Sequence, residues 1–226
     1  MIWRWVIYFS LTVGLASAAS VTGEVELTNS KNIGVRRHKD YAGVVIWLEP
    51  IDRPLPAMPP RKVEMQQKDK QFVPHVVAIS LGSTVEMPNL DMIFHNAFSL
   101  SEKARFDLGL YRNGASKPWT FENPGLVRIY CNIHPQMAAF VLVVDGTTYG
   151  QAGADGIVVL SGVPPGRRTV KVWDERGDEW TGAADVLPGR TASLSVMLDA
   201  SKWREVPHRN KYGKEYPPPD DDENRY

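Results

Sequence analysis

Residues 130–144 read YCNIHPQMAAFVLVV, and they disclose more about this chain than any other stretch. A thiol, an imidazole and a thioether follow one another at intervals of three residues, at Cys131, His134 and Met137. The runs on either side, Gly125–Tyr130 and Ala138–Val144, have the length and the β-branched, aromatic composition of strands. We therefore expect these three side chains to lie on a tight loop between two strands.

Short runs of this kind recur through most of the chain. Turn sequences such as Pro164-Pro165-Gly166 and Pro188-Gly189 separate them, and period-2 alternation is frequent. Apolar residues do not repeat at helical spacing over three turns anywhere in the sequence. Such a pattern is typical of antiparallel sandwiches, so we predict an all-β fold.

The sequence predicts two folded units and a tail. A more polar, glycine-rich stretch begins after Asp145, which places a first unit at residues 19–145 and a smaller β-sandwich at 146–200. Strand-like segments within residues 21–50 fit either unit, because the second unit is short for an independent sandwich. Residues 201–226 are polar, with a run of prolines followed by acidic residues, and we expect a disordered or surface-draped tail.

Composition excludes several classes of protein. The 226 residues contain 26 Lys+Arg and 26 Asp+Glu, so no net charge attracts nucleic acid or an anionic membrane. The one cysteine cannot form an internal disulfide. At 43% hydrophobic and 23% charged residues, the chain resembles neither a disordered nor a collagen-like protein.

The amino terminus has the pattern of a secretory signal. Arg4 precedes an almost wholly apolar run to Leu15, and Ala16-Ser17-Ala18 fits the small-x-small cleavage rule. The run is shorter than the ~20 residues that a spanning helix needs, and no second run follows. We expect residues 1–18 to be removed, leaving a periplasmic or secreted protein without a membrane span.

A thiolate, an imidazole and a thioether together suit copper. Two imidazoles, one thiolate and a weak axial thioether form the electron-transfer version of such a site, and His95, on a predicted strand, can supply the second imidazole. A structural zinc site normally has four protein donors, often including paired cysteines, and this sequence contains only one cysteine. A cysteine hydrolase is disfavoured because His134 is too close in sequence and no helix N-terminus activates the thiol.

The order His95, then Cys-x-x-His-x-x-Met, resembles the cupredoxins, the small blue copper proteins, with a loop length similar to that of amicyanin. Phe72-Val73-Pro74, Leu81–Val85 with Pro88-Asn89, and Pro124–Tyr130 resemble the segments that lead to the first histidine and to the cysteine in that family. The resemblance covers roughly residues 72–144 and implies a Greek-key β-sandwich.

The resemblance also implies the roles of individual residues. His95, Cys131 and His134 would form a trigonal set for one copper ion cycling between Cu(I) and Cu(II), and Met137 would be the axial ligand. Asn96 would support the site by bonding across to the cysteine loop. His75 is an additional imidazole that competes with Met137 in this interpretation or binds nothing.

The whole chain further resembles exported proteins labelled methylamine-utilisation-like, in which a cupredoxin domain carries a small module similar to carboxypeptidase-regulatory or transthyretin-like domains. Asp155-Gly156 and Gly162–Val170 carry this resemblance. The expected function is one-electron transfer with a periplasmic redox protein, a dehydrogenase or a cytochrome, rather than enzymatic catalysis, and the soft, mixed-ligand loop is the reason for it. Copper delivery or sensing, or a non-redox interaction module, is the alternative.

Overall fold

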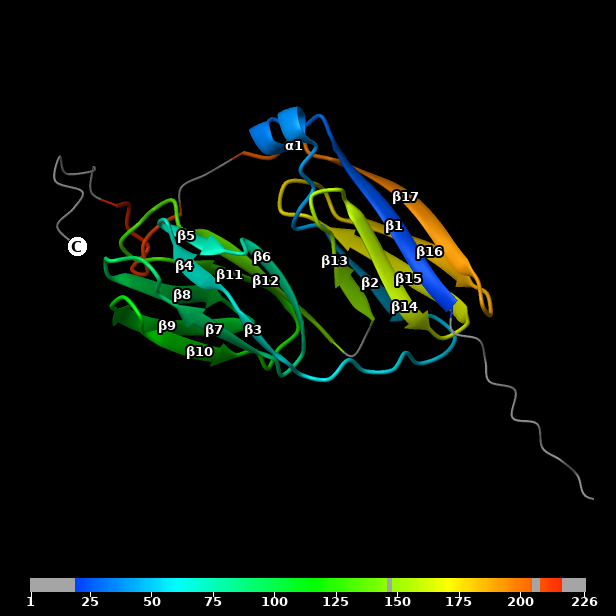
Figure 1. The fold of residues 1–226 in the computed structure, drawn as a ribbon, viewed down its shortest axis with the longest axis horizontal. Coiled ribbons are helices and arrows are strands. Elements are labelled where there is room, and N and C mark those ends of the chain that lie inside the picture. Colours follow the sequence, from blue (N-terminus) through cyan, green and yellow to red (C-terminus); the bar gives the residue numbers. More distant parts are fainter. Residues whose placement is uncertain (1–18, 146–147, 205–207, 217–226) are drawn as a thin grey trace, which may run out of the picture.

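The computed structural model describes residues 19–145, 148–204 and 208–216, and the expected all-β class is confirmed. The strands gather into two lobes that lie side by side (Figure 1). The signal-like residues 1–18 lie outside the described residues. In the part of the chain that is described, no helix has the length and apolar character needed to cross a membrane.

The first lobe, called the ligand lobe here, comes from the middle of the chain. It has a five-stranded sheet in the order β6-β12-β11-β8-β9, a three-stranded sheet in the order β10-β7-β3, and the β4-β5 hairpin. The strands are β3 (Lys62–Glu64), β4 (Gln66–Lys68), β5 (Gln71–Val73), β6 (Val76–Ser80), β7 (Thr84–Pro88), β8 (His95–Ser101), β9 (Ala104–Tyr111), β10 (Ser116–Thr120), β11 (Gly125–Tyr130) and β12 (Ala138–Val144).

The second lobe combines both ends of the described chain. Its sheets have the orders β14-β1-β17 and β13-β2-β15-β16, so the two early strands pair with strands that follow residue 148. The strands are β1 (Ala19–Thr28), β2 (Val45–Pro50), β13 (Tyr149–Gln151), β14 (Ile157–Val163), β15 (Gly166–Trp173), β16 (Trp180–Val186) and β17 (Thr191–Asp199).

The continuous apolar run of β12 is explained by burial on both of its faces. Ala139, Val141 and Val143 belong to the ligand-lobe core. The alternate residues Leu142 and Val144 belong to another buried cluster, which includes β6 of the same lobe and β2 and β13 of the second lobe. A strand covered on both faces loses the polar alternation of a half-exposed strand. The same cluster joins the two lobes.

A short helix, α1 (Ile33–His38), follows β1. The side chain of Asn32 accepts the backbone N–H of Val35, as an N-cap does, and Lys39 ends the helix in the left-handed conformation. Six residues are too few to give a helical periodicity in the sequence. The basic run Arg36–Lys39 forms the last turn of this helix and its C-cap.

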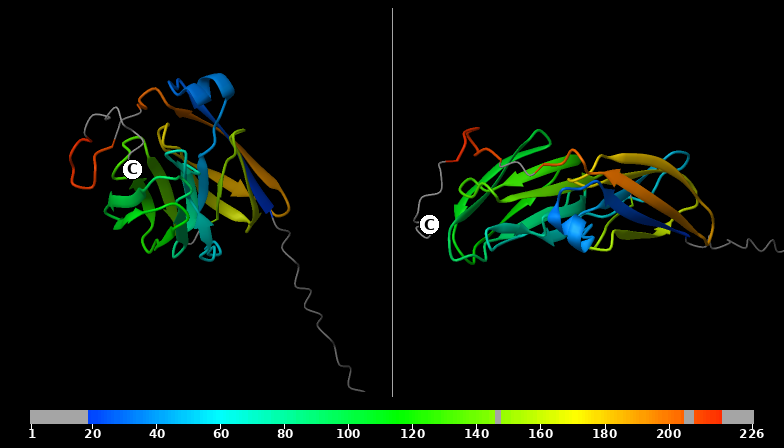
Figure 2. Two further views of the ribbon diagram at one scale, coloured as in Figure 1. Left: turned by 60° about the vertical axis from the view of Figure 1, so that its left-hand side comes forward. Right: turned by 90° about the horizontal axis from the view of Figure 1, so that it is seen from above.

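After β17 the chain leaves the second lobe and returns to the ligand lobe. Figures 1 and 2 show this segment in orange and red, with the red part beside the ligand lobe in all views. Residues 208–216, which the sequence places in the tail, carry no helix or strand but contact the ligand lobe through hydrogen bonds.

Candidate metal centre

Three potential metal donors converge at one end of the ligand lobe. Nδ1 of His95 and Nδ1 of His134 lie 3.1 Å apart, and Cys131 Sγ lies 4.0 Å from the first and 3.7 Å from the second. Among the described residues, these form a group of His, Cys and carboxylate side chains that is compact enough to hold one metal ion. His95 and Cys131 are fully buried, and His134 is partly exposed.

The sheet order explains why side chains so far apart in sequence meet. His95 begins β8, and Cys131 follows the last residue of β11. Both strands belong to one sheet as antiparallel neighbours, with Tyr130 opposite Phe98. The first residue of β8 and the residue after β11 therefore lie at the same end of the sheet. His134 joins them from the loop between β11 and β12.

That loop is closed by its own backbone. The Cys131 N–H donates to the Met137 carbonyl over 3.2 Å, and the Met137 N–H donates to the His134 carbonyl over 3.0 Å. The Met137 side chain is fully buried in the same core cluster as Cys131. The short loop thus holds the backbones of Cys131, His134 and Met137 together, and the Met137 side chain is buried in the core cluster that includes Cys131.

The Cys131 thiol is held in its protonated form when no metal is present. Burial raises its pKa, and backbone N–H groups of Ile133, Asn96 and His134 offset this only in part. A thiol of this kind is a poor nucleophile, because the thiolate is the reactive form. A metal cation would supply the charge that stabilises the thiolate here.

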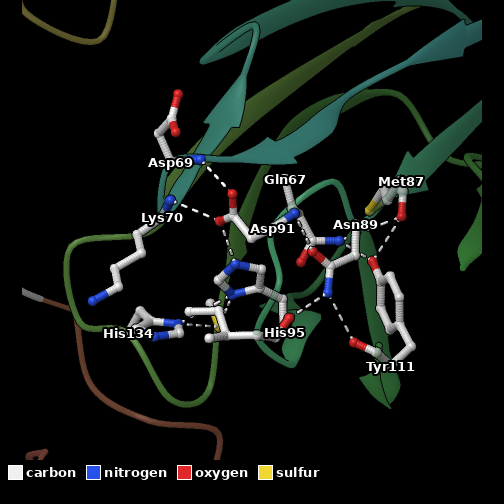
Figure 3. A network of polar contacts seen from close by, with 11 residues as sticks. Gln67, Asp69, Lys70, Met87, Asn89, Asp91, His95, Tyr111 and His134 are labelled. Atoms are coloured by element: carbon white, nitrogen blue, oxygen red, sulfur yellow. Dashed lines mark hydrogen bonds and ion pairs between the residues drawn. The ribbon is translucent and has the colours of Figure 1, made fainter. Parts of the chain in front are cut away.

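Asp91 orients the ring of His95. Its Oδ2 lies 2.7 Å from His95 Nε2 (Figure 3). The other ring nitrogen, Nδ1, lies 4.0 Å from Cys131 Sγ. The same carboxylate accepts the backbone N–H groups of Asp69 and Lys70. Burial alone would raise the pKa of Asp91, but the bonds from Lys70, His95 and Asp69 outweigh it and lower this pKa.

An ionised Asp91 can only accept, so His95 Nε2 carries the proton and Nδ1 presents its lone pair to the cluster. A carboxylate behind a ligating imidazole is the usual way of fixing its tautomer. Sequence reasoning missed Asp91. The available signal was its position four residues before a candidate ligand, at a turn.

Asn96 lies next to His95 and connects β8 to the loop between β11 and β12, residues 131–137, which is called the ligand loop from here on. Its Oδ1 accepts the backbone N–H of Asn132 over 3.2 Å, and its Nδ2 donates to Asp107 Oδ1 over 2.7 Å. The side chain is 1% exposed. It therefore ties the residue after Cys131 to the strand that carries His95.

His75 belongs to a different environment. Its Nε2 lies 2.7 Å from Glu175 Oε1 of the second lobe, and its ring packs edge-on against Phe140. The group formed by His95, Cys131 and His134 does not include it. His75 lines a cavity of about 1130 Å³ between the lobes, together with Trp173.

The positions of the donors fit a bound metal ion. The circle through His95 Nδ1, His134 Nδ1 and Cys131 Sγ has a radius of about 2.1 Å, close to the roughly 2.0–2.3 Å of metal–imidazole and metal–thiolate bonds. Two imidazoles and a thiolate are a soft donor set that suits copper. The donor set of two imidazoles and one thiolate therefore favours copper as the metal.

Comparisons with known proteins give partial structural likenesses. No protein-family profile and no curated protein sequence matches the chain. A purple cupredoxin from Nitrosopumilus maritimus is 22% identical over 36% of this chain and 98% of its own, with a TM-score of 0.33. A reduced amicyanin mutant is 19% identical over 45% of this chain and 99% of its own, with a TM-score of 0.35.

A third similar structure is a copper-containing nitrite reductase from Thermus scotoductus. It is 27% identical over 42% of this chain and 25% of its own, with a TM-score of 0.36. In all three comparisons the likeness covers less than half of this chain.

Proposed function

We propose that this chain is an exported copper protein that carries single electrons. His95, Cys131 and His134 would hold one copper ion, and the thioether of Met137 would be its fourth donor. The triangle of donor atoms is the observation that carries the proposal, because its size and composition suit a copper ion. When bound, the ion supplies a Cu(I)/Cu(II) couple.

The surroundings of the donors favour electron transfer over chemistry on a substrate. Asp91 fixes the ring of His95, and Asn96 fixes the loop beside Cys131. Ligands held in this way change position little when one electron arrives or leaves. The buried, protonated thiol offers no activated nucleophile.

The compartment and the partner are inferred from the sequence. The signal-like residues 1–18 support export to the periplasm or the exterior. We infer that the partner is a redox protein of that compartment, a dehydrogenase or a cytochrome that gives or takes one electron. The relation to methylamine-utilisation-like proteins and the transthyretin-like nature of the second lobe rest on sequence resemblance.

The test is spectroscopic. The chain is expressed in full and purified from the exported fraction, where mass spectrometry reports whether residues 1–18 are gone. After loading with Cu(II), we expect strong thiolate-to-copper absorption and an EPR signal, both bleached by ascorbate and restored by ferricyanide. Cys131→Ala should abolish the absorption, whereas His75→Ala should retain it.

Two results contradict the proposal. A colourless protein that binds no copper would leave the loop a structural element. A bound ion that ascorbate and ferricyanide do not cycle, but that a competing chelator removes at once, would indicate copper delivery instead.

A further inference from the structure

Residues 208–216, called the strap here, lie against the loop that carries the candidate ligands. They are the red segment beside the ligand lobe in Figures 1 and 2. The strap follows β17 of the second lobe, so the chain spans both lobes before it reaches the loop. None of its residues belongs to the donor group. Its contacts nevertheless concentrate on the residues next to that group.

The first contact reaches the cysteine itself. The Tyr216 hydroxyl donates to the backbone carbonyl of Cys131 over 2.7 Å. The Cys131 N–H is bound to the Met137 carbonyl. Both backbone polar groups of the cysteine are therefore paired, one within the loop and the other with the strap. Rotation of this peptide away from the cluster requires the bond to Tyr216 to break.

The second contact is a closed ring of hydrogen bonds. The backbone N–H of Lys211 donates to Asn132 Oδ1 over 3.0 Å, and Lys211 Nζ lies 2.6 Å from Asp107 Oδ2. Asp107 accepts from Asn96, which in turn accepts the Asn132 N–H. Four residues thus connect the strap, β9, β8 and the ligand loop. Each residue of the ring is held by two others.

The third contact is aromatic. The ring of His208 stacks on Tyr130, the residue before Cys131, with centroids 4.3 Å apart and an interplanar angle of 21°. Tyr216 packs edge-on against the same His208 ring, with centroids 5.3 Å apart. The strap therefore covers the polypeptide on both sides of the cysteine in sequence, at Tyr130 and at Asn132.

We propose that the strap is a latch on the metal centre, which holds the ligand loop closed and slows both release of copper and access of reagents to Cys131. This inference rests on the proposed copper site. The physical reason is that Cys131 and His134 must separate before an ion leaves. The strap opposes this because it holds the Cys131 carbonyl and the Asn132 side chain, at the start of the segment between the two ligands. Tyr216 and Lys211 are positioning residues that act through the loop.

The central variant is Tyr216→Phe, which keeps the ring and removes the hydroxyl. Tyr212→Phe is the matched control, because it lies on the same strap but its side chain is 72% exposed. Lys211→Met is a second variant that removes the ammonium group from Asp107. All three keep the length and approximate shape of the side chain, so folding should be preserved.

Two rates are measured on each full-length variant. One is the transfer of Cu(I) from the loaded protein to excess bathocuproine disulfonate. The other is alkylation of Cys131 by iodoacetamide in the metal-free protein. We expect Tyr216→Phe to accelerate both by about tenfold, equivalent to about 1.4 kcal/mol for the lost hydrogen bond. Lys211→Met should act in the same direction, and Tyr212→Phe should match the wild type.

The outcomes separate the latch from its alternatives. Unchanged rates in Tyr216→Phe and Lys211→Met would overturn the proposal. Faster rates accompanied by an equal loss of global stability in urea would also overturn it, because the strap would then act only on folding. If the wild type binds no copper, the proposed function fails, but alkylation of the metal-free protein still decides whether the strap closes the loop.

Discussion

Asp91 Oδ2 and His95 Nε2 lie 2.7 Å apart, and the other nitrogen of the ring, Nδ1, lies 4.0 Å from Cys131 Sγ. One carboxylate thereby fixes which ring nitrogen carries the proton and directs the other nitrogen to the donor group. The Asp91 carboxylate is itself held in place, because it accepts the backbone N–H groups of Asp69 and Lys70.

Replacing Asp91 by Ala should weaken copper binding by about 10- to 100-fold, because the His95 ring loses the partner that sets its tautomer. Competition with a chelator of known affinity measures the effect. Asp69→Asn is the control, because Asp69 contributes its backbone N–H to Asp91. An affinity unchanged in the Asp91 variant would show that the protein core alone orients His95.

Replacing Met137 by Leu should leave copper bound but raise the reduction potential. The side chain is fully buried, and Leu has a similar volume, so the fold should be retained. Loss of an electron-rich axial donor disfavours Cu(II) relative to Cu(I). Protein-film voltammetry measures the shift, with Met87→Leu, another buried methionine of this core, as the control. Equal potentials in both variants would remove Met137 from the ligand set.

Replacing His75 by Gln should remove a pH-dependent part of stability. Burial opposes the charged ring, but the hydrogen bond and the charge of Glu175 outweigh burial and the nearby Arg176, and raise the pKa of His75. Because the pKa of His75 is higher in the folded than in the unfolded chain, its protonation stabilises the fold. This stabilisation is fully present below the unfolded-state pKa of about 6.5 and is lost as the pH rises through the folded-state pKa.

Urea denaturation between pH 5.5 and pH 8.5 measures this dependence. The difference in the free energy of unfolding between wild type and His75→Gln should be largest at the acidic end of this range. We expect it to stay below about 1 kcal/mol, because the His75 side chain is 46% exposed and solvent screens its pair with Glu175. A difference that grows toward alkaline pH would contradict the assignment of the pair.

Replacing Arg168 by Met should destabilise the second lobe by about 3 kcal/mol. The Arg168 side chain is fully buried, and it donates to the carbonyls of Arg53, Pro164 and Pro165 and to Asp52. Met fills much of the space but leaves these acceptors without a donor. Unfolding in denaturant measures the loss of stability. Arg167→Met, at the exposed neighbouring residue, is the control variant. The copper spectrum should stay unchanged, because the site lies in the other lobe.

The strand assignments next to the ligand loop were predictable because they depend on local pattern. Gly125–Tyr130 and Ala138–Val144 are β11 and β12 with the boundaries expected from the sequence. The spacing within Cys131–Met137 is likewise local, since a short loop between adjacent antiparallel strands leaves its residues little room to separate. His95 was identifiable by its type and by its place on a predicted strand.

What the sequence alone determined is therefore the all-β class, the short loop with Cys131, His134 and Met137, and a candidate for the second imidazole. Tertiary structure decided the rest. It placed His75 against Glu175, 100 residues away, and it placed Tyr216 on the carbonyl of Cys131, 85 residues away. Periodicity and spacing describe neighbours along the chain, whereas these contacts depend on how the sheets and lobes pack, which leaves no local pattern in the sequence.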